Sequence, residues 1–439
     1  MDALFNFDRF LKAVDNMNTI RMCGTVTKVV GFVTEALGPA VSIGSLCEIC
    51  SREGKKRVKA EVMGFKNNRV LLVPLGEPRG IGPGSRVVAL NQSATIKVGK
   101  SLLGRIIDGL GRPLDGKGPI ISEEEYPIYS EPLNPMYRKL IEEPLDVGVR
   151  AINGLFTIGK GQRMGIFAGS GVGKSVLLGM MARHTKSDVN VIALIGERGR
   201  EVNEFLEKDL GPEGLARSVV VVATSDNLPL IRMRGAFIAH AIAEYFRDKG
   251  MHVLLMMDSI TRFAMAQREV GLATGEPPTT KGYTPSVFTL LPKLLERAGT
   301  GINGGTITGL YTVLVEGDDM NDPIADSVRS ILDGHIVLSR ELALQGHYPA
   351  IDVLSSISRV MDDIVSKEHK ELARKVKSVV STYKKAEDLI NIGAYVPGSN
   401  SKIDYALQMI DKINMFLRQD SGEKYSFDES IRDLQLLFA

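Results

Sequence analysis

Residues 161–175 read Gly-Gln-Arg-Met-Gly-Ile-Phe-Ala-Gly-Ser-Gly-Val-Gly-Lys-Ser, and this stretch decides the fold. A short apolar run ends at Ala168, a glycine-rich turn follows, and Lys174 opens a helix-like pattern. This order of strand, glycine loop and helix is the context that supports a phosphate-binding loop. Backbone N–H groups in such a loop cradle phosphate oxygens, and the helix N-terminus adds a favourable dipole.

The loop therefore predicts a nucleotide site. We expect Lys174 to reach the outer phosphates and the hydroxyl of Ser175 to hold Mg²⁺. The strict pattern has glycine where this chain has Ala168, and alanine still allows the turn if its φ is negative. The expected nucleotide-binding residues are Ala168, Gly169, Ser170, Gly171, Val172, Gly173, Lys174, Ser175 and Val176.

Two acids follow apolar segments further along the chain. Residues 253–257 predict a buried strand that ends in Asp258, a Walker B pattern, and open α/β sheets bind ligands at that end of their strands. Residues 189–195 predict a second strand, after which Glu197 could polarise an attacking water. Three arginines near these acids either bind phosphate or pair with local acids: Arg198, Arg200 and Arg262.

Composition narrows the function classes. The 439 residues carry a formal net charge of +2, which gives no overall attraction to nucleic acid or anionic membrane. No apolar run approaches the roughly 18 residues of a spanning helix, and the N-terminus lacks the pattern of a secretory signal. The three cysteines favour a reducing compartment. We interpret Cys47 and Cys50 as buried structural thiols rather than a redox or half-zinc motif.

The chain divides into four predicted parts. Residues 1–18 contain an amphipathic helix (4–17) that must dock on its own domain, a partner protein or a membrane surface. Residues 19–92 alternate short β-rich runs with turns, which predicts a small barrel or sandwich of structural or oligomerising role. Residues 93–360 alternate strands and helices, as in a mainly parallel α/β sheet, and residues 361–439 form a helical domain.

The expected elements can be stated by range. Barrel strands are expected at 24–33, 46–50, 59–65, 70–73 and 86–89. Sheet strands are expected at 164–167, 189–195, 219–223, 253–257, 307–315 and 335–338. C-terminal helices are expected at 370–389, 403–418 and 428–438. Residues 104–144 are expected to form a wrapped connection, and the acidic stretch 316–323 a structural loop near the sheet edge rather than a Ca²⁺ site.

Several motifs together resemble the type III export ATPases. They are the phosphate loop, Leu-Ile-Gly-Glu-Arg-Gly-Arg-Glu-Val (194–202) and Met-Met-Asp-Ser-Ile-Thr-Arg-Phe-Ala-Met-Ala-Gln-Arg-Glu (256–269). The match extends through Gly-Glu-Pro-Pro-Thr-Thr-Lys-Gly-Tyr (275–283) and the stretches 314–326 and 330–342. The likeness is greatest to the flagellar export ATPases. Injectisome ATPases are nearly as similar, and the catalytic subunit of rotary ATP synthases is a more distant relative.

The resemblance implies an α/β fold with a RecA-like P-loop ATPase core, an N-terminal β-barrel and a C-terminal helical domain. It also implies ATP and Mg²⁺ as ligands and a homohexameric ring with sites between subunits. Glu197 matches the catalytic glutamate, Arg198 its following arginine and Asp258 the Walker B aspartate. Arg359 matches the arginine finger that completes a neighbour's site. Tyr348 matches a tyrosine near the adenine, with Tyr395 a weak candidate for a second aromatic.

The resemblance implies partners as well. Residues 4–17 would bind a stator-like regulator, and the C-terminal helices would face the central stalk protein, the export gate and chaperone–substrate complexes. The expected location is cytoplasmic, peripheral at the inner face of the cytoplasmic membrane, with no nucleic-acid partner.

Four other functions set the alternatives. An injectisome ATPase shares the motifs, and a rotary ATP synthase catalytic subunit needs a non-identical partner in the ring. A hexameric helicase needs a barrel with stacking aromatics and a basic surface, which residues 19–92 do not offer. A non-catalytic subunit of the same fold usually lacks the glutamate that Glu197 supplies.

Overall fold

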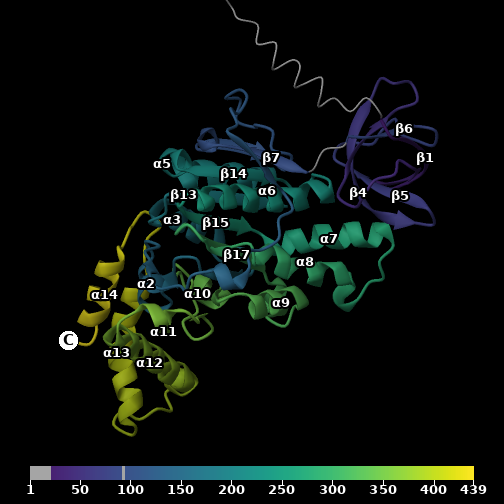
Figure 1. Ribbon diagram of the computed structural model, residues 1–439. Helices are drawn as coiled ribbons and strands as arrows, with labels where there is room; N and C mark the ends of the chain where they lie inside the picture. Colours follow the sequence, from purple (N-terminus) through teal and green to yellow (C-terminus); the bar gives the residue numbers. More distant parts are fainter. Residues whose placement is uncertain (1–20, 91–93) are drawn as a thin grey trace, which may run out of the picture. The chain divides into compact units, whose positions relative to one another are not determined.

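The computed structural model describes residues 21–90 and 94–439 (Figure 1). The chain forms two compact units, one reaching to Ala94 and including Ala273–Gly275, the other comprising Thr95–Leu272 and Glu276–Ala439. The helix expected over residues 4–17 lies outside the described residues.

The first unit is a closed six-stranded barrel. Its strands pair in the order β1-β2-β5-β4-β3-β6, and β6 pairs with β1 to close the ring. The strands are β1 (Cys23–Val30), β2 (Val33–Leu37), β3 (Leu46–Cys50), β4 (Arg57–Lys66), β5 (Arg69–Pro74) and β6 (Arg86–Ala89). Of the two predicted possibilities, barrel and sandwich, the barrel is confirmed.

One barrel prediction was wrong in detail. The single strand expected at 24–33 is a hairpin, because Gly31 adopts φ +56° and reverses the chain between β1 and β2. The barrel interior is filled by alternate apolar side chains, among them Ile49 and Leu72. Cys47 and Cys50 are buried free thiols, as predicted, and burial raises the pKa of the Cys47 thiol to about 11.

The second unit is built on a mainly parallel sheet with nine strands among the described residues. Their order is β19-β18-β12-β17-β15-β13-β14-β8, and β16 pairs with β17 beside this path. The strands are β8 (Arg105–Asp108), β12 (Arg163–Ala168), β13 (Val189–Ile195), β14 (Ser218–Ala223), β15 (His252–Asp258), β16 (Gly299–Thr300), β17 (Thr306–Leu314), β18 (Gly334–Leu338) and β19 (Ile357–Ser358). All six sheet strands predicted from the sequence are present.

The connection expected at 104–144 also carries strands. Its residues Arg105–Asp108 form β8, which pairs in parallel with β14 and extends the sheet. A separate pair, β7 (Thr95–Val98) and β9 (Glu124–Pro127), and the two-residue strands β10 (Pro144–Leu145) and β11 (Ile158–Gly159) complete the β structure. Strand β8 was not predicted, because it has only four residues and lies within a stretch rich in Gly and Pro.

Helices cover the sheet (Figure 1). The long α6 (Pro229–Asp248) packs on β13, β14, β15 and β17, and Pro229 at its first turn suits the helix start. The remaining helices before residue 365 are α2 (Arg150–Leu155), α3 (Lys174–His184), α4 (Gly199–Glu204), the π-helical η3 (Phe205–Leu210), α5 (Gly211–Ala216), α7 (Ile260–Thr274), α8 (Pro285–Leu295), α9 (Pro323–Ile331), α10 (Arg340–Leu344) and α11 (Met361–Ile364). Short 3₁₀ turns are η1 (Lys100–Leu102), η2 (Pro135–Tyr137), η4 (Thr280–Gly282) and η5 (Glu316–Asp318).

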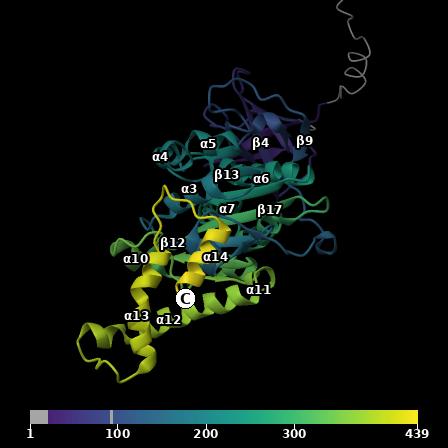
Figure 2. The ribbon, with the colours of Figure 1, turned by 90° about the vertical axis from the view of Figure 1, so that its left-hand side faces the viewer.

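Three helices follow, as predicted: α12 (Lys367–Asn391), α13 (Ser401–Leu417) and α14 (Phe427–Leu436) (Figure 2). They share one apolar core with the sheet domain, through contacts of α2 with α13 and α14. Arg150 also donates hydrogen bonds to the carbonyls of Met415, Phe416 and Arg418, which satisfies the C-terminal end of α13. Residues 361–439 therefore belong to the same compact unit as the sheet. The domain boundary expected after residue 360 stays a prediction.

In the part of the chain that the structure describes, we find no helix long and apolar enough to cross a membrane.

Candidate active site

The phosphate loop has the predicted architecture. Strand β12 ends at Ala168, and α3 begins at Lys174. Gly171 and Gly173 adopt φ +79° and +90°, conformations that glycine reaches without the strain of a side chain. Ala168 lies in the extended strand, outside the residues with positive φ, so alanine at the position of the first motif glycine is compatible with the turn.

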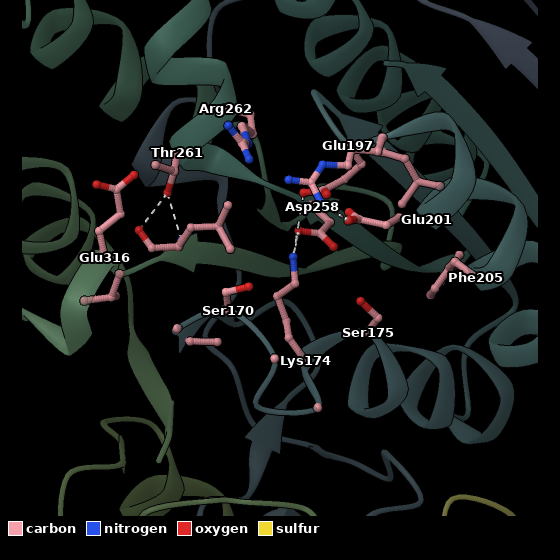
Figure 3. A pocket seen from close by; sticks show the side chains of 18 of the residues that line it. Ser170, Lys174, Ser175, Glu197, Glu201, Phe205, Asp258, Thr261, Arg262 and Glu316 are labelled. Carbon is pink, nitrogen blue, oxygen red and sulfur yellow. Dashed lines mark hydrogen bonds and ion pairs between the residues drawn. The ribbon is translucent and has the colours of Figure 1, made fainter. Parts of the chain in front are cut away.

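The loop opens on a cavity of about 620 Å³ (Figure 3). Glu197 and Asp258 come from the ends of β13 and β15 and lie beside Lys174 in this cavity. The lining residues are Ala168, Gly169, Ser170, Gly171, Gly173, Lys174, Ser175, Val176, Leu194, Glu197, Arg198, Glu201, Val202, Phe205, Asp258, Thr261, Arg262, Met265, Leu314, Val315, Glu316, Gly317 and Arg340. Among the predicted loop residues, Val172 is buried beneath the loop and does not line the cavity.

Lys174 joins the two acids. Its Nζ lies 2.5 Å from Oδ1 of Asp258 and 3.7 Å from Oε1 of Glu197, as the dashed contact to Asp258 in Figure 3 illustrates. All three side chains are largely buried, so their charges interact more strongly than at the surface. Lys174 thus pairs with both acids, although it lies at the end of the loop that would hold phosphates.

Asp258 has a second partner that the sequence reading missed. The hydroxyl of Thr312, on β17, donates a hydrogen bond of 2.7 Å to Oδ1 of Asp258. Strands β15 and β17 are parallel neighbours with Met257 opposite Tyr311, which brings Thr312 alongside Asp258. The only signal in the sequence is a threonine in a buried strand, where a hydroxyl needs a partner, and Thr306 and Thr308 of the same strand give the same signal.

Glu197 has the environment of a general base. Burial raises the pKa of its carboxyl to about 7, and the nearby charge of Asp258 adds to this, while Lys174 opposes it. Oε1 of Glu197 has no hydrogen-bond partner. A buried carboxylate oxygen that accepts no hydrogen bond, with the nearest cation, Lys174, 3.7 Å away, is suited to accept a proton from a bound water near neutral pH.

The three arginines behave differently from one another. Arg198 and Arg200 are exposed and pair with Glu201 and Glu204, each at 3.2 Å, so pairing with local acids describes both in this structure. Arg262 lines the cavity, its Nε is buried without a hydrogen-bond partner, and within the described residues it forms no ion pair. The sequence left phosphate binding and pairing with local acids open for these arginines, and Arg262 is the one that stays available for phosphate binding.

The placement predicted for the acidic stretch 316–323 was wrong. β17 lies in the middle of the sheet, between β12 and β15, so the stretch follows a central strand rather than lying near the sheet edge. Glu316 and Gly317 line the cavity, and Asp318 pairs with Arg340 at 3.0 Å beside the phosphate loop. Among the described residues no cluster of three or more acids, histidines or cysteines could hold a metal by itself.

Two predicted residues lie away from the cavity lining. Tyr348 is half exposed, and its ring lies against the loop, since a Cβ on Gly173 would be 3.3 Å from its Cε1. Arg359 is exposed and follows β19, whose Ser358 pairs with Gly334 at the start of β18. The phosphate loop instead follows Ala168, which pairs with Leu338 at the far end of β18. Four residues of strand, roughly 13 Å, separate these positions along the sheet.

The residues present fit a magnesium ion bound together with nucleotide phosphates. Mg²⁺ prefers oxygen ligands and is usually held by one or two protein oxygens plus phosphate oxygens and water. Ser175 presents an exposed hydroxyl in the first turn of α3, and Asp258 presents a carboxylate at the end of β15. These two residues would hold the ion.

A phosphate loop, a Walker B aspartate and a buried glutamate at the carboxyl edge of a parallel sheet define a P-loop ATPase with a RecA-like core.

Comparisons with known proteins agree with this class and refine it. Residues 26–91 match the β-barrel domain of the ATP synthase alpha/beta family, and residues 148–358 match that family's nucleotide-binding domain. Residues 365–436 match the C-terminal domain of the type III secretion ATPase EscN.

Whole-length relatives are also similar. The chain is 56% identical to the flagellum-specific ATP synthase of Bacillus subtilis, over 97% of this chain and 98% of that one. It is 52% identical to the type 3 secretion system ATPase of Xanthomonas euvesicatoria, over 94% and 93%. The structure of assembled EscN from enteropathogenic E. coli matches with a TM-score of 0.90 and 47% identity, over 95% of this chain and all of that one.

The chain therefore belongs to the ATP synthase alpha/beta family and, within it, to the flagellum-specific ATP synthases and type III secretion ATPases. It is an ATPase of the type III export class, and the predicted three-part fold is confirmed.

Proposed function

We propose that this protein hydrolyses ATP, with Mg²⁺ held by Ser175 and Asp258, to energise the export of flagellar proteins by a type III apparatus. Glu197 would orient and deprotonate the attacking water, and Lys174 would move from the two acids to the outer phosphates. When bound, the Mg²⁺ would neutralise charge on the phosphates. The observation that carries the proposal is the buried, partly unpartnered Glu197 beside Lys174 and Asp258.

We propose further that the working form is a homohexameric ring in which Arg359 of one subunit completes the site of the next. The exposure of Arg359 and its distance from the chain's own phosphate loop support this, because the residue is not placed to serve the site of its own subunit. An arginine supplied by a neighbour stabilises charge on the transferring phosphoryl group. Arg198, at the rim of the cavity, belongs to the same proposed machinery.

The adenine pocket is proposed on the same resemblance. Tyr348, which lies against the loop at Gly173, is the proposed aromatic neighbour of the base. Tyr395, in the connection between α12 and α13, is not a good second aromatic, because its hydroxyl donates a hydrogen bond of 2.9 Å to Asp404 of α13.

The partners and location are likewise proposals. A solved structure of EscN in complex with its central stalk EscO resembles this chain with a TM-score of 0.87 and 46% identity, which supports a stalk partner here. We propose the export gate and chaperone–substrate complexes as further partners of α12–α14, and a stator-like regulator for residues 4–17. The proposed location is cytoplasmic, peripheral at the inner face of the cytoplasmic membrane.

An injectisome is the second candidate system, favoured by the 52% identity to the Xanthomonas enzyme. The two systems differ in their substrates rather than in the chemistry of the site. Deleting the gene in its own organism separates them: loss of flagellar filaments supports the flagellar proposal, and intact filaments with failed effector secretion would replace it.

Steady-state ATPase measurements test the catalytic assignment. Glu197→Gln should lower kcat at least about a hundredfold while nucleotide still binds, because general-base catalysis contributes about 10²–10⁴-fold. Lys174→Ala should also abolish turnover while the far-ultraviolet circular dichroism spectrum stays that of the wild type. Glu213→Gln, at an exposed glutamate that does not line the cavity, is the control and should retain most activity. Substantial turnover by Glu197→Gln would remove Glu197 from the mechanism.

A further inference from the structure

The hydroxyl of Thr312 is in a position that the catalytic scheme does not use. Thr312 is fully buried in β17, and its Oγ1 lies 2.7 Å from Oδ1 of Asp258. The same oxygen is 3.3 Å from the carbonyl of Met257, a longer contact to an uncharged acceptor. Because one hydroxyl donates one proton and bonds to charged acceptors are shorter and stronger, the proton belongs on the contact to Asp258.

The other partner of that carboxylate oxygen is Lys174, at 2.5 Å. Lys174 is also the residue that the phosphate loop would direct to the outer phosphates of a nucleotide. Its three N–H donors would then be shared between phosphate oxygens and Asp258, so we expect nucleotide binding to weaken the hold of Lys174 on Asp258. Thr312 is anchored in the backbone of a central strand and has no such competing role.

We propose that Thr312 is a positioning residue that keeps the Asp258 carboxylate oriented toward Mg²⁺ when Lys174 turns to the nucleotide. The proposal rests on the assignment of Asp258 to the Mg²⁺–nucleotide site. Oδ1 is the oxygen that Thr312 contacts, and a fixed Oδ1 sets the plane of the whole carboxylate. Burial of Thr312 excludes a bulk water that could replace the hydroxyl.

Three variants separate positioning from structural support. Thr312→Val keeps the shape and removes the hydroxyl, and Thr312→Ser keeps the hydroxyl and removes a methyl group. Thr308→Val is the matched control: Thr308 lies four residues earlier on β17, is equally buried, and its Oγ1 accepts a hydrogen bond from the backbone of Gly161 rather than contacting the site. Thr312→Ala provides a second hydroxyl-free variant if valine prevents folding.

The readout is binding rather than turnover. We would titrate each purified protein with a fluorescent ADP analogue, once with excess Mg²⁺ and once with EDTA. For the wild type we expect tighter binding with Mg²⁺. For Thr312→Val we expect Kd with Mg²⁺ to rise about tenfold and Kd in EDTA to change less than about twofold. Thr312→Ser should recover most of the Mg²⁺-dependent affinity, and Thr308→Val should bind as the wild type does.

The outcomes distinguish the two levels of the proposal. Equal weakening of Thr312→Val with and without Mg²⁺, or no weakening at all, would overturn the role of Thr312 and leave the nucleotide site standing. Wild-type binding that does not depend on Mg²⁺ would overturn the assignment of Asp258, on which the inference depends. A loss in Thr308→Val equal to that in Thr312→Val would show that any buried threonine of β17 matters only for the strand.

Discussion

Replacing Glu197 by glutamine should stabilise the nucleotide-free protein, and the gain should grow with pH. The pKa of the Glu197 carboxyl is raised from 4.5 to about 7, first by burial and then by the nearby charge of Asp258. Between these values the folded protein binds a proton that the unfolded chain has released. The free energy of unfolding therefore falls as pH rises from about 4.5 to about 7.

The size of the effect follows from the shift. At about 1.4 kcal/mol per pKa unit, ionising Glu197 in the folded state costs about 3 kcal/mol at pH 8 and less than about 1 kcal/mol at pH 5. Glu197→Gln removes this cost. For a unit of this size we expect its melting temperature to exceed that of the wild type by about 3 °C at pH 8 and about 1 °C or less at pH 5.

Differential scanning calorimetry without nucleotide or Mg²⁺ measures the effect. Glu213→Gln is the control, since Glu213 is exposed and does not line the cavity, and it should show no growing gain with pH. A melting temperature for Glu197→Gln that is no higher than that of the wild type at pH 8 would refute the reasoning, as would the same difference at both pH values.

Two further predictions concern the scaffold around the site. Gly173→Ala should destabilise the protein by about 1–2 kcal/mol and weaken nucleotide binding, because Gly173 adopts φ +90° and the added Cβ would lie 3.3 Å from the ring of Tyr348. Gly104→Ala is the control. Gly104 adopts φ +75° but has open space around its Cβ, so this variant should lose stability and leave nucleotide binding unchanged. Arg297→Met should cost about 3–5 kcal/mol, since it leaves Glu244 buried and without the bidentate partner now at 2.6 and 2.8 Å. Thermal unfolding measures both effects, and the double variant Arg297→Met/Glu244→Leu should recover much of the loss; a double variant no more stable than the single one would contradict the ion-pair explanation.

The sequence predicted the parts of the site that local pattern determines. Glu197 and Asp258 lie at the end of an apolar strand or within two residues of it, and the phosphate loop that leads to Lys174 begins directly after Ala168, so the strand signal also located the acids and the loop. Gly31 shows the limit of such patterns, because a hairpin and a long strand share the same β-rich composition.

The missed residues depend on sheet order instead. β17 follows β15 in the chain but lies between β12 and β15 in the sheet, and no local signal states this. That insertion brings Thr312 to Asp258 and the stretch after β17 to the cavity. The same stretch, read by composition, resembled a peripheral loop. Strand order is a property of the whole packed domain, and therefore the second layer of the site could not be predicted from the sequence alone.

The central claim is that the active site is completed by a second copy of the chain. The measurement that tests it most directly is the ATPase rate per chain against protein concentration, for the wild type, Arg359→Ala and the exposed-arginine control Arg79→Ala. The account predicts a rate that rises cooperatively with concentration in the wild type and the control and is lost in Arg359→Ala. A rate independent of concentration and unchanged in Arg359→Ala would contradict it, because the site would then be complete within one chain.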